Sequence, residues 1–177
     1  LEVMGGYAQL KHVGAVGAKL LYPGTRRVQH AGIVNLAEGP HHAFHNVKAE
    51  DPCVFARNLL EYNWVAVTGA CMAIEREKFM QAGGFDESLP IAYNDVELCF
   101  RLIDMGYYQV VCPGVELIHH ESASRGLDAA NEIKWARLQR EKLRLYQMHP
   151  AFFMKDPFHN PNLAPNDVHF TPAQVAM

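Results

Sequence analysis

The segment that most constrains the fold is residues 94–106, NDVELCFRLIDMG. Apolar side chains recur in it at helical spacing, and Gly106 supplies a helix-end signal. A helix with one apolar face is stable only when that face packs on another element. Short runs rich in β-branched residues lie on both sides of this segment. The pattern therefore predicts an α/β domain in which helices flank a mixed sheet.

Glycine, proline and the change between extended and helical spacing divide the rest of the chain. Gly83 and Gly84 should end the second helix, because glycine adopts a left-handed cap easily. Pro113 and Gly114 should separate two short strands. Residues 35–51 show no clear period and are expected to form a loop. The expected strands are 13–22, 26–34, 65–74 (a central buried strand), 107–113 and 115–120, and the expected helices are 1–12, 75–84, 94–106 and 129–147.

The composition of the 177 residues, 49% of them hydrophobic, allows one compact domain with its own core. Five prolines follow from position 150 onward with little periodicity. We therefore expect residues 1–148 to form the folded part and residues 149–177 an irregular, Pro/Asn-rich tail.

Charge and cysteine usage exclude several classes of protein. A formal charge of -3 and a pI of about 6.4 leave no basic footprint for nucleic acid. No apolar run approaches the roughly 20 residues that a membrane-spanning helix needs. The four cysteines are widely spaced, which argues against a zinc knuckle or a disulfide framework. Reduced thiols favour a cytoplasmic location, with a peripheral position at the inner membrane left open.

Asn94, Asp95 and Glu97 form the first candidate site. A structural interpretation is that Asn94 caps the helix and that the two carboxylates complement its dipole. The functional interpretation is that Asp95 accepts a proton from an attacking hydroxyl. Glu97 should lie about 200° around the helix from Asp95, so the two carboxylates should not share one site.

Two groups of histidines could bind a metal. His119 and His120 end an expected strand, where adjacent residues face opposite sides, so only one of them should face a given site. His41, His42 and His45 lie in the expected loop. From the residues alone, ordinary polar positions are the favoured explanation of both groups. Elsewhere, Gly69 and Ala70 would let a ligand approach the backbone closely, although tight packing would also explain a small pair.

Four segments, taken in order, carry a resemblance: VTGACMAIEREKF, GGFDESL, NDVELCFRL and LIHHESASRG. With these gaps, residues 13–126 resemble the second half of bacterial family 2 glycosyltransferases, and DPFHNPNL is similar to the tail of members that build cell-envelope polysaccharides. The resemblance implies the GT-A fold, and no D-x-D or D-D occurs in the chain. We therefore expect a partial GT-A fold that begins after the nucleotide-binding half and is inactive alone.

The resemblance also implies roles for individual residues. Asp95 matches the catalytic base, and Asn94 stands where many relatives have an acidic residue. A divalent metal, Mn or Mg, would be held partly by His119, with His120 as the alternative. Gly69 and Ala70 would border the donor diphosphate and the acceptor, and the loop with Asp86 would border the acceptor pocket.

The expected function of the intact enzyme is transfer of a hexosyl or deoxyhexosyl group, with inversion, from a nucleotide-sugar to a glycan or lipid-linked acceptor. One alternative is a non-catalytic carbohydrate-binding or scaffold module with the same fold. Another is a metal-dependent hydrolase built on the four histidines His41, His42, His119 and His120.

Overall fold

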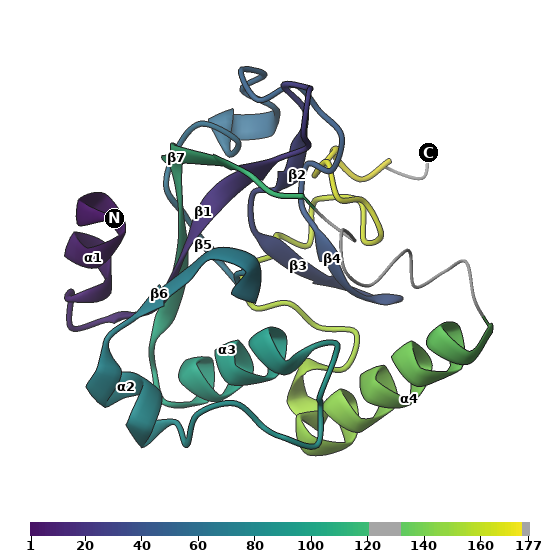
Figure 1. The fold of residues 1–177 in the computed structure, drawn as a ribbon. Coiled ribbons are helices and arrows are strands. Elements are labelled where there is room, and N and C mark those ends of the chain that lie inside the picture. Colours follow the sequence, from purple (N-terminus) through teal and green to yellow (C-terminus); the bar gives the residue numbers. More distant parts are fainter. Residues whose placement is uncertain (121–131, 175–177) are drawn as a thin grey trace.

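The main sheet of the computed structural model, which describes residues 1–120 and 132–174, has five strands in a mixed arrangement (Figure 1). Its order is β2-β1-β7-β5, and β6 also pairs with β1. The β1–β7 pair is parallel and the other pairs are antiparallel. The predicted mixed α/β sheet is confirmed. The strands are β1 (Val13–Leu21), β2 (Val28–His30), β5 (Tyr62–Trp64), β6 (Met72–Ile74) and β7 (Tyr108–Ile118).

The two strands predicted on either side of Pro113 are one continuous strand, β7. Its register against β1 shifts between Ala18, which pairs with Cys112, and Lys19, which pairs with Glu116. The shift leaves residues 113–115 outside the regular pairing with β1. Proline has no N–H to donate to a ladder, and bulges accommodate it. The break that the sequence indicates is therefore a bulge and not a turn.

The prediction of one central strand over residues 65–74 is wrong. Strand β5 ends at Trp64, and a 3-10 turn, η2 (Gly69–Cys71), separates it from the short strand β6. The turn forms because the Thr68 side chain accepts a hydrogen bond from the Ala70 N–H at 3.3 Å. Gly69 and Ala70 are consequently exposed, within a turn at the edge of the sheet.

The helices agree with the sequence in position. They are α1 (Glu2–Ala8), α2 (Arg76–Gln81), α3 (Asn94–Asp104) and α4 (Glu132–Met148). After α2, Gly83 and Gly84 have φ values of +87° and +72°, as the predicted cap requires. None of the helices in the described ranges is long and apolar enough to cross a bilayer.

The start of α3 differs from the prediction that Asn94 caps it. The cap residue is Tyr93, which has a left-handed backbone (φ 62°) and makes no side-chain cap bond. Asn94 is the first helical residue. Glu97 does not reach back to the helix start, because it is 2% exposed and bonded elsewhere.

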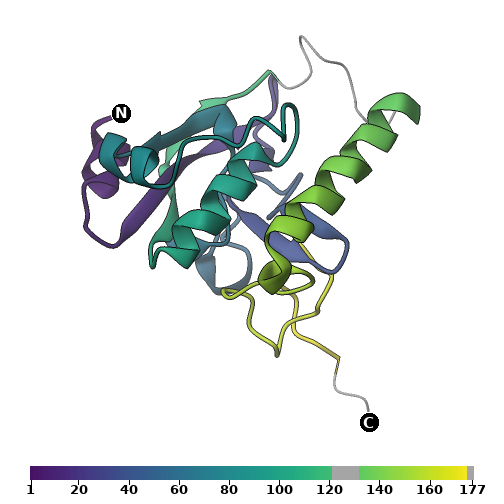
Figure 2. The ribbon, with the colours of Figure 1, turned by 90° about the horizontal axis from the view of Figure 1, so that it is seen from below.

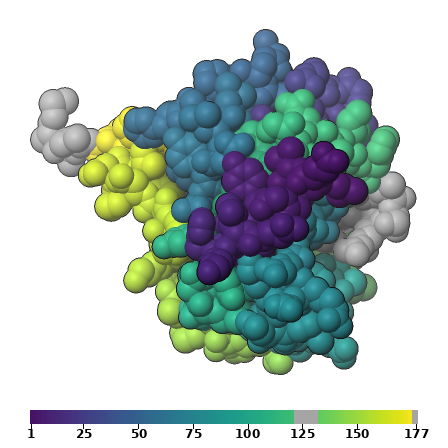
Figure 3. Space-filling view, turned by 90° about the vertical axis from the view of Figure 1, so that its left-hand side faces the viewer, coloured from purple at the N-terminus to yellow at the C-terminus, as the bar shows by residue number. Residues whose placement is uncertain are grey.

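Helices cover both faces of the sheet. On one face, Met4 and Ala8 of α1 pack on apolar residues of β1 and β7, and Figure 3 shows α1 lying across that face. On the other face, α3 packs on β1 and β7 and contributes Leu98, Phe100 and Leu102 to the larger core. The alternating side chains of β1 thus supply both cores.

A second, two-stranded sheet begins in the expected strand 26–34 and extends into the expected loop 35–51. Strand β3 (Ile33–Leu36) pairs with β4 (Gly39–His42) as an antiparallel hairpin. Figures 1 and 2 show α4 beside this hairpin, and the Lys142 ammonium donates to the Glu38 carbonyl at 3.0 Å. Strand β4 was not predicted, because its sequence, GPHH, does not alternate between apolar and polar residues.

The described part of the tail, residues 149–174, belongs to the core. It begins with the short turn η4 (Pro150–Phe152), and it buries Phe152, Leu163 and Phe170. Phe152 stacks on Phe100 of α3 with ring centroids 4.1 Å apart. The Asn35 side chain donates to two tail carbonyls at 2.5 and 3.0 Å. The described tail therefore packs with the elements that precede it.

We predict that Gly32→Ala destabilises the protein by about 2–4 kcal/mol. Gly32 has a φ of +122°, and a Cβ atom there would lie 2.2 Å from the Trp64 ring. Urea unfolding measures the free-energy difference. Gly5→Ala is the matched control, because nothing lies within 4 Å of its added Cβ. Equal stabilities of the two variants would contradict the observed packing.

Candidate functional site

Asp95 is held at the start of α3 by two backbone hydrogen bonds. Its Oδ2 accepts from the Gly69 N–H at 2.8 Å, and its Oδ1 accepts from the Val96 N–H at 2.9 Å. A carboxylate has about four acceptor positions, so the hydrogen bonds leave room for another donor. Within the described residues no lysine or arginine pairs with Asp95. The side chain is half-buried and therefore reachable, while its orientation is fixed.

Helix α4 positions the segment that leads into Asp95. The Glu141 carboxylate, 6% exposed, accepts from the Ala92 N–H at 2.6 Å. Tyr93 follows in its left-handed conformation, which costs free energy for a non-glycine residue. Burial, together with the nearby Glu141, raises the pKa of Tyr93 to about 12, so the phenol stays neutral. A residue far along the chain thus stabilises the strained entry to α3.

Glu97 and Arg101 connect α3 to the end of α2. Arg101 donates to Glu97 through Nε at 2.8 Å and Nη2 at 2.5 Å, and it also donates to the Ala82 and Gly84 carbonyls. His149 contacts Glu97 at 2.9 Å. Burial alone would raise the pKa of Glu97, but the hydrogen bonds from His149 and Arg101 lower it overall. As predicted from the helix geometry, the two carboxylates do not share one site: Glu97 contacts Arg101 and His149, whereas Asp95 contacts Gly69.

His119 lies just beyond β7 and is oriented by β2. Its Nδ1 is 2.8 Å from Oε1 of Gln29. A carboxamide oxygen only accepts, so in the neutral imidazole Nδ1 carries the proton and Nε2 keeps a lone pair. His120 is exposed, whereas His119 is half-buried. Of the two histidines, His119 is the one whose ring is oriented with a lone pair available for a ligand.

His30, which the sequence does not indicate as a site residue, lies between the contacts of Asp95 and those of His119. It is fully buried, its Nε2 is 3.5 Å from the Thr68 N–H, and its Nδ1 is 2.9 Å from Nδ1 of His42. Burial lowers the pKa of His30 well below 6.5, and His42 and His119 lower it further. The residues next to His30 in the sequence do not indicate a site. Its contacts with His42 and Thr68 form only when distant segments come together in the fold.

Strand β2 therefore brings the two halves of the candidate site together. Gln29 contacts His119, and the adjacent His30 contacts Thr68, whose neighbour Gly69 holds Asp95. The contacts form one continuous series from the start of α3 to the end of β7.

The described contacts of the other predicted site residues are with residues close to them in the sequence. Ala70 belongs to the turn capped by Thr68. Asn94 is half-buried beside Asp95. Asp86 accepts from the Ser88 N–H at 2.7 Å, and the hydrogen bonds from the Ser88 side chain and then from its N–H lower the pKa of the Asp86 carboxyl group. Asp86 thus shapes its own loop.

The three histidines of the expected loop 35–51 do not lie together at one site. His45 contacts the Tyr22 hydroxyl at 2.7 Å, His42 contacts His30, and His41 is exposed on β4. Across the described ranges there is no group of three or more His, Cys, Asp or Glu side chains placed to hold a metal. His119 has the chemistry of a single metal ligand, so the remaining ligands would have to come from elsewhere.

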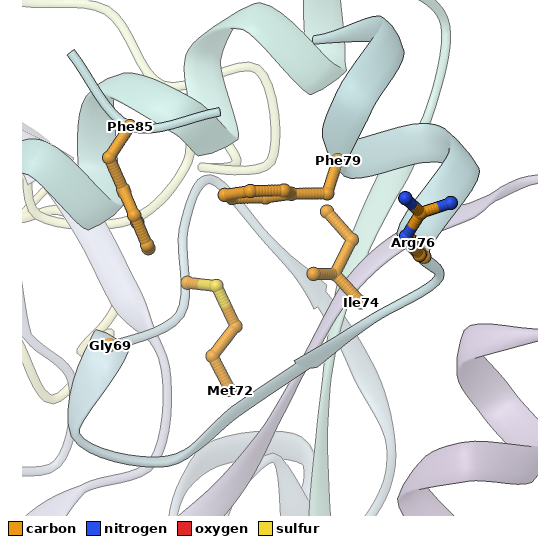
Figure 4. Close-up of a pocket in the computed structure, with 6 residues that line it drawn as sticks. All are labelled: Gly69, Met72, Ile74, Arg76, Phe79 and Phe85. Carbon is orange, nitrogen blue, oxygen red and sulfur yellow. The ribbon is translucent and has the colours of Figure 1, made fainter. Parts of the chain in front are cut away.

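A pocket of about 430 Å³ opens beside Gly69 (Figure 4). The Gly69 N–H that donates to the Asp95 carboxylate thus belongs to a residue of the pocket wall. The side chains of Met72, Ile74, Phe79 and Phe85 gather around the same space. The hydrogen bonds of Arg101 to the loop before Phe85 fix one side of the pocket. The lining residues are Gly69, Met72, Ile74, Arg76, Phe79 and Phe85.

Comparison with known proteins relates the chain to proteins of glycan assembly. No family model matches it. It is 43% identical over 166 residues to an uncharacterized protein of Sinorhizobium fredii and 40% identical over 168 residues to the O-antigen biosynthesis protein RfbC of Myxococcus xanthus. These alignments cover 93% and 92% of the chain, but only 18% and 12% of the two relatives.

A third relative carries an enzymatic name. Over 67 residues, 38% of the chain, the sequence is 37% identical to the N-acetylglucosaminyl-diphospho-decaprenol L-rhamnosyltransferase of Mycobacterium tuberculosis, of which it spans 22%. The chain therefore spans less than a quarter of each of these relatives. Two of the names, O-antigen biosynthesis and rhamnosyl transfer, indicate a relation to glycosyltransferases.

We predict that His30 makes stability depend on pH. Because its folded pKa lies below 6.5, the unfolded chain binds more protons at low pH, and the free energy of unfolding falls as pH decreases below about 6.5. Between pH 7.5 and 5.5 the contribution is ~1 kcal/mol. Urea unfolding should show this loss in the unmodified protein and a smaller one in His30→Gln. The exposed His12→Gln is the control, and an equal loss in His30→Gln would contradict the assignment.

Proposed function

We propose that this chain forms the acceptor-side part of an inverting, family 2 glycosyltransferase domain with a partial GT-A fold. The observation that carries the proposal is Asp95, whose carboxylate accepts at 2.8 Å from the N–H of Gly69, a residue that lines a pocket. Similarity to an O-antigen biosynthesis protein and to a rhamnosyltransferase supports it. The donor would be a nucleotide-sugar and the acceptor a glycan or lipid-linked sugar, presented at the cytoplasmic face of the inner membrane.

In the proposed reaction Asp95 is the general base. Its carboxylate takes the proton of the acceptor hydroxyl while that oxygen forms a bond to the anomeric carbon of the donor. The bond from the anomeric carbon to the nucleoside diphosphate breaks, and the electron pair leaves with the diphosphate. One displacement inverts the configuration. The hydrogen bonds from Gly69 and Val96 keep the carboxylate aligned throughout.

A divalent cation, Mn or Mg, would neutralise the charge that develops on the leaving diphosphate. His119 suits the position of one ligand, because its contact with Gln29 leaves the lone pair of Nε2 available. The described part of the chain offers no complete set of ligands. The diphosphate itself would therefore supply part of the coordination.

Asp95→Asn should lower kcat by roughly 100- to 10,000-fold, because the amide keeps the shape but accepts no proton. Transfer of labelled sugar by the full-length protein measures the change, and the affinity for the donor should stay nearly constant. Asp104→Asn, at the other end of α3, is the matched control, with its side chain 60% exposed. Unchanged turnover in Asp95→Asn would contradict the assignment of Asp95 as the general base.

His119→Ala should raise the Mn²⁺ concentration needed for half-maximal turnover by about tenfold or more, since it removes a direct ligand. His120→Ala, one residue along and exposed, should leave that concentration unchanged. Metal titrations of both variants in the transfer assay make the comparison. The opposite ranking would transfer the role to His120.

A further inference from the structure

The outer face of α4 carries exposed apolar and basic side chains together. Glu141 and Leu145 are buried on the inner face of this helix. The outer side chains recur every three or four residues, as the residues of one helix face do. Ile133 is 78% exposed and Leu143 is 60% exposed, so large apolar groups of this face lie in solvent. The exposed residues of the outer face are Ile133, Ala136, Arg140, Leu143, Arg144 and Gln147.

The first turn of α4 projects beyond the rest of the molecule. Figures 1 and 2 show that the N-terminal end of the helix extends past both sheets. Ile133 and Trp135 point about 200° apart around the helix axis. Both are nevertheless exposed, at 78% and 51%. Tryptophan is enriched where one edge of the ring meets hydrocarbon and the other meets water. The projecting end of α4 is therefore apolar on more than one side.

Basic residues accompany the apolar side chains of α4. The helix contains five basic and two acidic residues, whereas the whole chain has a net charge of -3. Of the two acidic residues, Glu141 is 6% exposed and accepts from the Ala92 N–H, so only Glu132 is exposed. Arg140 and Arg144 are exposed on either side of Leu143 in the sequence. Positive charge is therefore concentrated on the helix that also presents apolar groups.

The segment after α4 continues this apolar surface. Phe153 and Met154 are each 58% exposed. The Phe153 ring meets the Tyr146 ring of α4 edge to face, with centroids 5.4 Å apart. Tyr146 follows Leu143 by three residues, and residues at this spacing are neighbours on a helix surface. We call the combined region the α4 surface, and its residues are Ile133, Trp135, Arg140, Leu143, Arg144 and Phe153.

The composition and shape of the α4 surface fit a lipid bilayer better than other ligands. A projecting helix is convex, whereas small-molecule sites are concave. A partner helix would need a continuous apolar seam, but Arg140 and Gln147 interrupt the series on the outer face. Guanidinium groups bind phosphate oxygens, and exposed tryptophan and aliphatic side chains enter the boundary between headgroups and acyl chains.

From this combination we infer that the α4 surface docks the protein on an anionic lipid bilayer. Ile133 and Trp135 enter the boundary between headgroups and acyl chains, and Arg140 and Arg144 contact the lipid phosphates. The helix lies on the membrane and does not cross it, in agreement with its length and charge. The proposed transfer function uses no residue of the α4 surface, so the inference stands apart from it.

Cosedimentation of the 177-residue chain with vesicles tests the inference. Binding to vesicles of phosphatidylglycerol and phosphatidylethanolamine should be at least about tenfold tighter than binding to phosphatidylcholine vesicles, and added salt should weaken it. Arg140→Gln should weaken binding to the anionic vesicles by about fivefold. Ile133→Ser combined with Trp135→Ser should weaken it by at least about tenfold, because both side chains leave water on binding.

Tryptophan fluorescence shows whether the helix end enters the bilayer. The chain has two tryptophans, and Trp64 is 2% exposed, so Trp135 should dominate any change on binding. Anionic vesicles should shift the emission to shorter wavelength. Trp135→Phe should remove this shift and keep most of the binding, because phenylalanine is also apolar. Binding without a shift would show that charge alone holds the protein, and would overturn insertion.

The matched controls lie on α1, which Figures 1 and 2 show on the opposite side of the molecule from α4, and directly after it. Val3→Ser removes a side chain that is 53% exposed, and Lys11→Gln removes an exposed charge. Both variants should bind vesicles like the unmodified protein.

Three results would overturn the inference. They are equal binding to anionic and neutral vesicles, binding that the α4 variants leave unchanged, and sedimentation of the chain as a dimer that Leu143→Ser dissociates. The last result would assign the surface to a second copy of the chain. Asp95→Asn should keep vesicle binding while it loses transfer, so the inference and the proposed function can fail independently.

Discussion

The parallel pairing of β1 with β7 is the contact on which the rest of the structure depends. Every other strand of the main sheet is hydrogen-bonded to one of these two, and both helical layers pack on them. The pairing joins segments that are far apart in the sequence. It continues beyond the strands, where the His119 N–H donates to the Leu21 carbonyl at 3.1 Å. The position of His119 relative to β2 is therefore a direct result of the strand register.

The geometry at Asp95 depends on a second set of long-range contacts. The helix that carries it is fixed to the α2 loop by Arg101, and the segment before it is fixed to α4 by Glu141. Gly69 then holds the carboxylate from the opposite side. Three different parts of the chain thus determine where one side chain points. Such positioning by surrounding structure is what a proton-accepting group requires.

How much of this could be predicted varies with the range of the interactions. Helix α3 and the Gly83–Gly84 cap follow from local spacing, and the structure has both. The cap of α3 did not follow, because Glu97 is engaged by Arg101 and His149, partners that local sequence cannot indicate. Within the candidate site, Asp95 and His119 could be named from sequence and resemblance. His30 could not, because its surroundings exist only after β2, β4 and the Thr68 turn come together.

A cluster of three buried aromatic rings, Phe44, Trp64 and Phe170, affects the order of folding. Phe170 packs against Phe44 and Trp64, and the Arg57 guanidinium lies over the Trp64 and Phe170 rings. Two of these rings are made early in synthesis and the third comes near the end of this sequence. Contacts of such wide separation form late because closing a long loop costs entropy. During translation, the Trp64 and Phe44 rings would stay incompletely covered until Phe170 leaves the ribosome, which gives a chaperone an apolar surface to recognise.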